Sequence, residues 1–256
     1  MTRFGNLKYW VKQMKNLINN IICGDAIEEM KKIPDGSVDM ILCDLPYGTT
    51  KCRWDTPLPL DELWEQYLRV TKERAAIVLT ASQPFTSVLI CSNLKHYRYN
   101  WVWEKSKASG YLNAKRMPLK AHEEVCIFYK KPPIYNPQFW ESTPYNKGEA
   151  HRPTEVYGKQ KSVLVKSDGQ RYPRSVQYFK TAESEGKTRH ATQKPLALFE
   201  YMIETYTNPG DLVLDSCIGS GTTAVAAKRL KRNYIGIDKD PEYVIISKER
   251  LENTHE

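Results

Sequence analysis

Two short motifs, one early in the chain and one near its end, contain the residue types most suited to chemistry. Residues 44–47 read Asp-Leu-Pro-Tyr, and residues 215–221 read Asp-Ser-Cys-Ile-Gly-Ser-Gly. The second motif follows a short apolar run and precedes a run of small residues. A strand, a glycine turn and a helix N-terminus in that order form a backbone cradle that binds nucleotides. The pattern therefore predicts a nucleotide-containing cofactor beside Gly219 and Gly221.

A carboxylate follows this cradle at the end of the next strand-like run. Asp238 closes the run 234–237, and an acidic residue at this place can accept hydrogen bonds from ribose hydroxyls. The spacing of Gly219, Gly221 and Ala224 also fits the dinucleotide pattern G-x-G-x-x-G/A, so a nicotinamide oxidoreductase stays open as an alternative. Such a fold has most of its sheet after the glycine turn, whereas this chain of 256 residues ends soon after Asp238. The other strands must therefore come from upstream.

The strands that position these residues are predicted from apolar runs upstream of the cradle. The run 38–43 leads directly into Asp44, so its carboxylate is expected at the end of a strand. The predicted fold class is α/β, a Rossmann-like sheet with helices on both faces and a circularly permuted strand order. Further strands are predicted at 20–23, 75–80, 99–103 and 124–129, and helices at 10–18, 26–32, 60–68, 195–207 and 240–251.

The two motifs, in this order, resemble those of the β-class DNA amino-methyltransferases, which use S-adenosylmethionine and carry D-P-P-Y ahead of F-x-G-x-G. The resemblance covers nearly the whole chain, including residues 24–25 (Gly-Asp), 47–50 (Tyr-Gly-Thr-Thr) and 190–195 (His-Ala-Thr-Gln-Lys-Pro). It is closest to the compact adenine-N6 enzymes of bacteriophages and prophages.

Three positions depart from the family pattern. Leu45 and Ala191 replace prolines, and Cys217 replaces a phenylalanine. The change at Leu45 keeps the backbone carbonyl that the family uses, and the change at Cys217 implies looser packing beside the cofactor. None of the three removes a group that the chemistry requires.

The resemblance implies a role for each residue of the early motif. The Asp44 carboxylate and the Leu45 backbone carbonyl would accept the two hydrogens of an exocyclic amine, so that its lone pair points at the sulfonium methyl. Pro46 has no N–H and a fixed φ, which helps to set the direction of that carbonyl. Tyr47 would stack on the base, which must be flipped out of the duplex to reach the pocket. Taken alone, the same four residues also fit an ordinary strand-to-turn transition.

The resemblance also implies which residues bind S-adenosylmethionine. Asp238 would hold the ribose, and Asp215 would lie near the methionine moiety. Asp25 would contact the adenine, although an aspartate here can also simply cap a helix. Lys194 would pair with the cofactor's carboxylate, the alternative being a surface lysine. The complete predicted set is Asp25, Thr192, Lys194, Asp215, Cys217, Gly219, Ser220, Gly221 and Asp238.

Residues 131–189 differ in composition from the rest of the chain. They are rich in proline and tyrosine and hold 11 Lys or Arg against six Asp or Glu, a net charge of +5. In the family this place holds the target-recognition region, and the basic and aromatic composition favours DNA contact over a merely solvated insertion. The predicted organisation is 1–130 as the catalytic half, 131–189 as the target-recognition insertion and 190–256 as the cofactor-binding half of one methyltransferase domain.

The composition of the whole chain suits a polyanionic partner. The formal net charge is +8 and the pI is near 9.0, which favours double-stranded DNA as the partner. The cysteines and histidines show no metal-ligand spacing, so we expect no metal. We see no apolar leader or membrane-spanning run, so we expect no membrane partner and a cytoplasmic location in a bacterial or phage-infected cell. The predicted phosphate contacts, each otherwise only a solvated charge, are Lys51, Arg53, Lys105, Lys107, Lys115 and Arg116.

These observations together predict a site-specific DNA methyltransferase that moves a methyl group from S-adenosylmethionine to the exocyclic amine of a flipped base. Asp44 favours adenine N6, because the family's cytosine-N4 enzymes commonly begin the motif with serine. Cytosine N4, an RNA substrate, and a nucleic-acid-binding module with an inactive pocket stay open as alternatives. The sequence decides neither the recognition sequence, nor a homodimer, nor a restriction endonuclease partner.

Overall fold

A computed structural model of the chain describes residues 14–49, 55–150, 162–186, 188 and 193–254. The chain divides into two compact units. The larger unit comprises Met1–Asn136 and Ser175–Glu256, and the smaller unit is Pro137–Arg174. The smaller unit is therefore shorter at both ends than the predicted insertion 131–189.

The larger unit is built on one eight-stranded mixed sheet, in the order β1-β12-β11-β2-β3-β5-β4-β10. The first five strands of the sheet (β1, β12, β11, β2 and β3) all run parallel to one another. β5 is antiparallel to both of its neighbours, β3 and β4. The C-terminal strands thus lie between N-terminal ones, as the predicted permutation requires. In chain order the strands are β1 (Asn20–Cys23), β2 (Val38–Asp44), β3 (Thr71–Ala81), β4 (Tyr97–Ser109), β5 (Lys120–Phe128), β10 (Val176–Phe179), β11 (Leu212–Asp215) and β12 (Asn233–Asp238).

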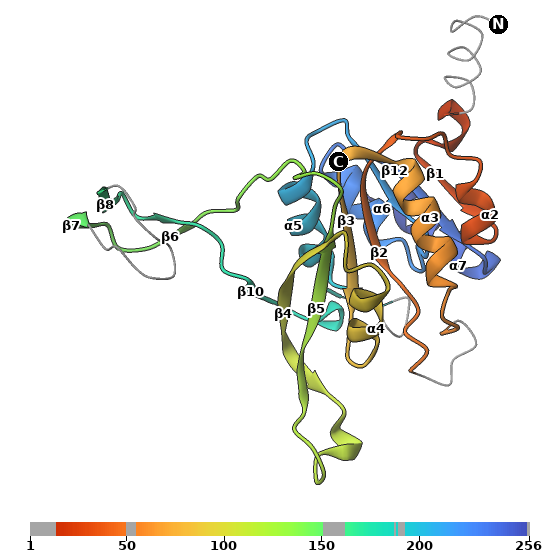
Figure 1. The fold of residues 1–256 in the computed structure, drawn as a ribbon. Coiled ribbons are helices and arrows are strands. Elements are labelled where there is room, and N and C mark those ends of the chain that lie inside the picture. The colour runs from red at the N-terminus through yellow and green to blue at the C-terminus, as the bar shows by residue number, and fades with distance from the viewer. Residues whose placement is uncertain (1–13, 50–54, 151–161, 187, 189–192, 255–256) are drawn as a thin grey trace, which may run out of the picture. The chain divides into compact units, whose positions relative to one another are not determined.

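Helices cover both faces of this sheet (Figure 1). Side chains alternate between the faces along each strand, and β2 shows the result. Ile41 and Cys43 pack in the core beneath one set of helices, whereas Met40 and Leu42 pack in the core beneath the other set. The first set is α2 (Ala26–Met30), α3 (Leu60–Val70) and α4 (Phe85–Ser92), and the second is α5 (Leu196–Tyr206), α6 (Thr222–Arg229) and α7 (Pro241–Glu252).

The amphipathic pattern that predicted a helix at 60–68 is explained by its buried face. In α3 the side chains of Leu63, Trp64 and Tyr67 are buried against the sheet. The indole N–H of Trp64 donates to Ser92 Oγ at 2.7 Å, which joins α3 to the end of α4. The predicted helices at 26–32, 195–207 and 240–251 are confirmed as α2, α5 and α7. Of the predicted helix 10–18, only the part from Met14 onward lies in the described residues.

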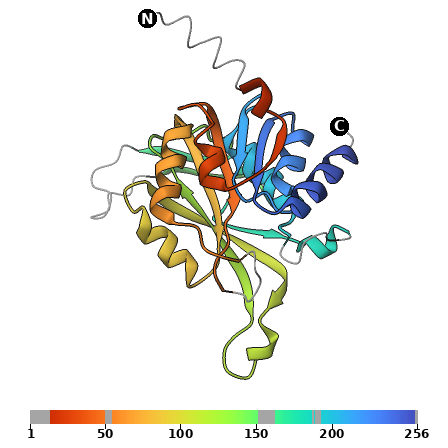
Figure 2. The ribbon, with the colours of Figure 1, turned by 90° about the vertical axis from the view of Figure 1, so that its right-hand side faces the viewer.

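The stretch 105–122, which separates the predicted strands 99–103 and 124–129, is mostly a hairpin. β4 continues to Ser109 and β5 begins at Lys120, with Ser109 paired to Lys120 and only a short 3-10 turn (η1, Tyr111–Asn113) between the two strands. The apolar alternation that marks a strand ends near Trp103 because the hairpin beyond it has no core to face. Figure 2 shows the hairpin projecting from the larger unit.

The smaller unit consists of two short antiparallel pairs of strands. β6 (Trp140–Glu141) pairs with β9 (Gln170–Arg171), and β7 (Tyr145–Ala150) pairs with β8 (Val163–Ser167). Among the described residues of this unit, no hydrophobic side chain is buried. Polar and cation–π contacts hold it together: the Arg171 guanidinium donates to the Thr143 carbonyl at 2.5 Å and lies 4.6 Å from the centre of the Tyr145 ring. The poor hydrophobic periodicity of its sequence therefore agrees with the lack of buried apolar side chains among its described residues.

Candidate active site

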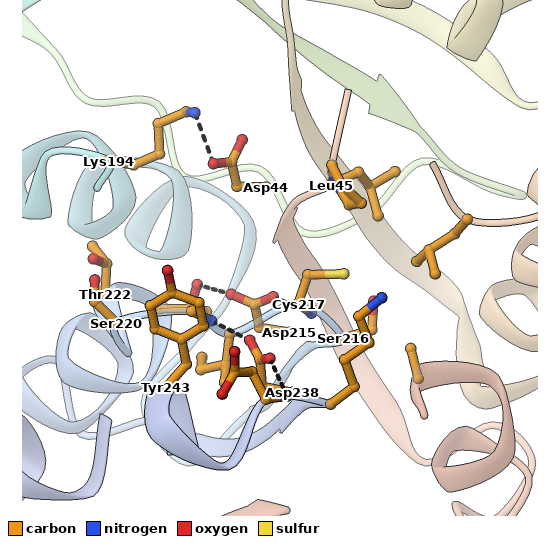
Figure 3. A pocket seen from close by; sticks show the side chains of 18 of the residues that line it. Asp44, Leu45, Lys194, Asp215, Ser216, Cys217, Ser220, Thr222, Asp238 and Tyr243 are labelled. Atoms are coloured by element: carbon orange, nitrogen blue, oxygen red, sulfur yellow. Dashed lines mark hydrogen bonds and ion pairs between the residues drawn. The ribbon is translucent and has the colours of Figure 1, made fainter. Parts of the chain in front are cut away.

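The two sequence motifs meet at one cavity of about 490 Å³, at the carboxyl ends of β2, β11 and β12 (Figure 3). Strands β2 and β11 are parallel neighbours that end at Asp44 and Asp215, so both carboxylates lie at the same edge of the sheet. This edge is where ligands bind in open α/β sheets. The predicted site residues that line the cavity are Asp25, Asp44, Leu45, Pro46, Lys194, Asp215, Cys217, Gly219, Ser220 and Asp238.

The glycine turn is fixed in place by α7. Gly219 and Gly221 have φ of 51° and 84°, a conformation that glycine adopts without the penalty of a side chain. A Cβ at Gly221 would lie 3.0 Å from the Ser247 Cβ and 3.1 Å from its Cα, so close packing against α7 also favours glycine at this position. The Ser247 hydroxyl donates to the Gly219 carbonyl at 2.7 Å. Gly221 therefore shapes the turn by packing against α7, whereas Gly219 lines the cavity.

Asp238 is held rigidly at the mouth of the glycine turn. Its Oδ2 accepts the backbone N–H of Gly219 and its Oδ1 accepts that of Asp240, both at 2.9 Å. Asp25 has two roles, because its Oδ1 accepts the backbone N–H groups of Ile27 (3.0 Å) and Glu28 (3.2 Å) while the residue also lines the cavity. The helix-cap alternative for Asp25 is thus confirmed, and it does not exclude a contact with a ligand.

Asp215 is a buried carboxyl in the wall of the cavity. Its Oδ1 accepts the backbone N–H of Cys217 at 3.0 Å, and its Oδ2 accepts the Thr223 hydroxyl. Burial raises the pKa of Asp215 to about 7, although the hydrogen bonds from Thr223 and Cys217 oppose that shift. Protonation of this group therefore changes within the neutral pH range.

The Asp44 carboxylate is surrounded by donors. Oδ1 accepts the Tyr47 hydroxyl at 2.8 Å and the Thr80 hydroxyl, and Oδ2 accepts the Lys194 ammonium at 2.7 Å. An ionised carboxylate offers about four acceptor positions. Three are used by these described residues, so the remaining one lies on Oδ2, beside Lys194.

Lys194 belongs to a chain of alternating charges. Its Nζ lies 3.5 Å from Glu123 Oε2, and Glu123 Oε1 lies 3.2 Å from the Nζ of Lys105. Burial alone would lower the pKa of Lys194, but the charges of Asp44 and Glu123 outweigh it and raise that pKa. Lys194 is therefore a buried cation with two carboxylate partners rather than a surface lysine.

The Tyr47 ring is packed against protein rather than into the cavity. It stacks on Phe85 with ring centres 5.2 Å apart and planes inclined by 22°, and the Lys194 Nζ lies 5.3 Å from its centre. Burial, and then the charge of Asp44, raise the pKa of its hydroxyl. In this conformation Tyr47 orients Asp44, and its predicted stacking on a base stays a prediction.

The predicted phosphate contacts fall into three groups. Lys107, Lys115 and Arg116 are exposed on the hairpin. Lys105 does not fit the prediction, because its side chain is only 6% exposed and is paired with Glu123. Lys51 and Arg53, and with them the predicted cofactor contact Thr192, lie outside the described residues.

Several residues of the site were not identified from the sequence. Thr80 lies next to the last residue of β3 and is paired with Asp44 of β2, a place that the strand-end rule could have indicated. Glu123 of β5 contacts both Lys105 and Lys194, and the second of these contacts joins residues far apart in the sequence. Buried Asp55 accepts the backbone N–H groups of Gly48 and Thr49, both at 2.8 Å, and so fixes the start of the loop after the early motif. Tyr243 of α7 lines the cavity near Asp238 (Figure 3).

Neither a metal centre nor a membrane-spanning helix is present among the described residues. Within them, no group of three or more His, Cys, Asp and Glu side chains is placed to hold a metal ion. None of the described helices combines the length and the apolar character that crossing a membrane requires.

Comparison with known proteins gives consistent matches over most of the chain. The family model N6_N4_Mtase, described as DNA methylase, matches residues 38–249. The chain is 31% identical to the DNA adenine methyltransferase YhdJ of Escherichia coli (strain K12), over 98% of this chain and 85% of that protein. It is 29% identical to the type II methyltransferase M.HpaI of Haemophilus parainfluenzae, over 91% of this chain and 74% of that protein.

Solved structures show the same fold. The M1.HpyAVI–SAM complex is similar with a TM-score of 0.62 and 28% identity, covering 91% of this chain and 99% of that chain. The cytosine-N4-specific PvuII DNA methyltransferase has a TM-score of 0.62 at 18% identity, covering 90% of this chain and 85% of that chain, which shows likeness of fold alone. The predicted α/β fold class is thereby confirmed.

Proposed function

The chain belongs to the N6_N4_Mtase family of DNA methylases, and from this premise we propose that it transfers a methyl group from S-adenosylmethionine to adenine N6 in double-stranded DNA. The enzyme class follows from the family. The adenine N6 target is supported by the aspartate that opens the early motif and by the likeness to a DNA adenine methyltransferase.

One observation carries the proposal: a single cavity is lined both by Asp44, Leu45 and Pro46 and by the glycine turn with Asp238. Methyl transfer requires donor and acceptor to be held together in line, because positioning accounts for much of the rate enhancement. A cavity that joins an amine-binding motif to a nucleotide cradle meets that requirement. A module that only binds nucleic acid does not need the nucleotide cradle.

The cradle fits S-adenosylmethionine in size and in chemistry. Its volume of about 490 Å³ lies within the range of small-molecule sites. Asp238 would accept the ribose hydroxyls in the orientation that the Gly219 and Asp240 amides impose. Buried Asp215 would face the cationic methionine end. When bound, the cofactor supplies a methyl group activated by its sulfonium charge.

The protein's part in the reaction is to hold the amine. The Leu45 carbonyl would accept one amine hydrogen, and the remaining acceptor position on Asp44 Oδ2 would accept the other. The Tyr47 and Thr80 hydroxyls fix Oδ1, so the carboxylate has one orientation in which to receive the amine. Both hydrogens are then engaged, and the nitrogen lone pair is directed toward the sulfonium methyl. Because a base in a duplex cannot reach this edge of the sheet, it must be flipped.

The smaller unit, Pro137–Arg174, is the candidate for reading the target sequence. It carries seven Lys or Arg against four Asp or Glu, and its exposed aromatic side chains include Trp140, Tyr145 and Tyr172. Cations position a protein on phosphates, and a few polar or aromatic side chains read base edges. These features support target recognition by this unit.

The test of the proposed function is methylation of plasmid DNA by the purified protein, followed by base-resolved mapping. We expect N6-methyladenine at one short sequence, formed only when S-adenosylmethionine is added. Methylation of cytosine N4 would correct the base while keeping the enzyme class. Cofactor binding without methyl transfer to DNA would instead favour a binding module with an inactive pocket.

A further inference from the structure

The β4–β5 hairpin extends beyond the sheet edge at which Asp44 lies. Strand register shows this, because Asp44 pairs with Thr80, and Thr80 pairs with Val125 of β5. Val125 is therefore level with Asp44. From there to Lys120, β5 continues outward for about 16 Å, at about 3.3 Å per residue. The hairpin tip lies farther out still, so it extends past the catalytic edge.

The hairpin tip exposes large apolar side chains in a defined turn. Tyr111 is 77% exposed and Leu112 is 84% exposed, and Met117 is exposed beside them. The turn is ordered by backbone hydrogen bonds from Asn113 to the Gly110 carbonyl (3.0 Å) and from Arg116 to the Asn113 carbonyl (2.8 Å). A formed turn that presents apolar groups to water on a projecting element indicates a contact with a partner.

The charge around the tip identifies the class of that partner. Lys107, Lys115, Arg116 and Lys120 flank the apolar residues, and residues 105–122 contain no Asp or Glu. Lys107 pairs with Glu183 of another segment at 3.8 Å, but the cluster as a whole keeps a positive charge, which suits a phosphate backbone. Apolar side chains between such cations suit the stacked interior of a duplex, into which proteins insert apolar wedges.

We propose that Tyr111 and Leu112 form a wedge that inserts into the base stack of duplex DNA next to the flipped base, while Lys115 and Arg116 contact the phosphates. This inference rests on the proposed function, since it assigns the step that extracts the base. A wedge that fills the space left by the base lowers the free energy needed to keep it extrahelical.

The root of the hairpin is joined to the catalytic carboxylate. Lys105 on β4 pairs with Glu123 on β5, Glu123 contacts Lys194, and Lys194 pairs with Asp44. The Trp103 indole N–H also donates to the Phe179 carbonyl at 2.9 Å, which secures β4 to β10. The tip is therefore presented to DNA from a root whose position relative to Asp44 is fixed.

The test compares paired and unpaired targets. Leu112→Ala and Tyr111→Ala are compared with wild type and with Leu94→Ala, an equally simple change at a 63% exposed leucine outside the hairpin. Substrates are a duplex of the mapped sequence and the same duplex with an abasic site opposite the target base. Rates of methylation are measured, together with the fluorescence of 2-aminopurine placed at the target position.

We expect each wedge variant to methylate the paired duplex about tenfold more slowly than wild type and to recover to within about threefold on the abasic duplex, because an unpaired base is easily flipped. The 2-aminopurine fluorescence should fall together with the methylation rate on the paired duplex. Leu94→Ala should match wild type on both substrates. Lys115→Gln should weaken binding to both duplexes alike, without rescue.

Equal losses on the two substrates, or wild-type rates in both wedge variants, would overturn the wedge. A change in oligomeric state with unaltered base flipping would assign the tip to a protein partner instead. If wild type methylates no DNA at all, the proposed function and the wedge both fail. If wild type methylates DNA normally and the wedge variants are unaffected, the wedge is ruled out and the proposed function stands.

Discussion

The Lys194 ammonium lies 2.7 Å from Asp44 Oδ2, although the two residues are 150 positions apart in the sequence. Asp44 ends β2, and Lys194 directly precedes Pro195, the N-cap of α5. Both line the cavity, so a positive charge already occupies one side of the carboxylate that is proposed to receive the amine. The amine must therefore bind beside Lys194, on the same oxygen.

The first prediction concerns Asp44. Asp44→Ala should lower the methylation rate by at least about 100-fold, because an acceptor for the developing charge on the amine is lost. The affinity for S-adenosylmethionine, measured by calorimetry, should change little. Asp35→Ala, a change at an exposed aspartate, serves as the control and should behave as wild type. Near-normal turnover of Asp44→Ala would remove Asp44 from the chemistry.

The second prediction is that Lys194 and Glu123 are energetically coupled. Lys194→Met should lower the free energy of unfolding by about 3 kcal/mol, because it leaves Asp44 without its cation and leaves Glu123 with Lys105 alone. Adding Glu123→Gln to this variant should restore part of the stability, since one of the two charges is then removed. Urea unfolding of wild type, both single variants and the double variant measures the coupling. Simple additivity of the two changes would contradict it.

The third prediction concerns the ribose. Asp238→Ala should weaken binding of S-adenosylmethionine about tenfold or more, because a charged acceptor of hydrogen bonds is lost. Asp238→Asn is the matched variant, since it keeps the shape of the side chain and one acceptor oxygen for the backbone amide of Gly219. It should show an intermediate affinity in calorimetry. Unaltered affinity in both variants would mean that Asp238 does not contact the cofactor.

The fourth prediction is a pH dependence that originates at Asp215. Its pKa is raised from 3.8 to about 7 by burial, so the folded state favours the protonated form. The stability that it contributes is fully present below its unfolded pKa and is lost as pH rises through about 7. The wild type should therefore lose stability relative to Asp215→Asn between about pH 4 and 7, with a slope of at most about 1.4 kcal/mol per unit. Urea unfolding across this range measures the difference, and a constant difference would contradict the prediction.

The fifth prediction concerns sequence specificity. If Pro137–Arg174 is exchanged for the corresponding segment of a related enzyme with another specificity, the methylated sequence should change to that of the donor. The methylated atom should stay the same, because the Asp44 cavity lies wholly in the larger unit. Base-resolved mapping of plasmid DNA gives both answers. An active chimera that keeps the original sequence would place recognition elsewhere, with the hairpin as the next candidate.

The sequence predicted the core strands well because each is an apolar run that stops at a polar residue. β1 lies at the predicted residues, and β2 differs from the prediction only by including Asp44. The ordered motifs also predicted many of the residues that line the cavity, although Tyr47 and Gly221 do not line it. These features depend on neighbouring residues or on where a strand ends, so they can be recognised in a single sequence.

Contacts between distant side chains did not show in the sequence. Lys105 was predicted to contact phosphate because its local context is basic, but strand register places it against Glu123. The Tyr47 ring packs on Phe85 in this structure, a contact that the sequence did not indicate, and its stacking on a base stays a prediction. The outer part of the hairpin was not predicted as strand, because a strand without a core lacks an apolar face. Each of these differences arises from tertiary contacts that residue type and spacing do not record.

The pairing of β1 with β12 has a consequence for how the protein is made. Asn20 is paired with Ile235, so these neighbouring strands are separated by about 200 residues of synthesis. One edge of β2 likewise stays unpaired until β11 has been synthesised. Pairing over such separations is slow, and a nascent chain with open strand edges is prone to associate with others. The early motif is thus translated long before the sheet that orients it can form, and a chain stopped short of Leu212 contains Asp44 but no site.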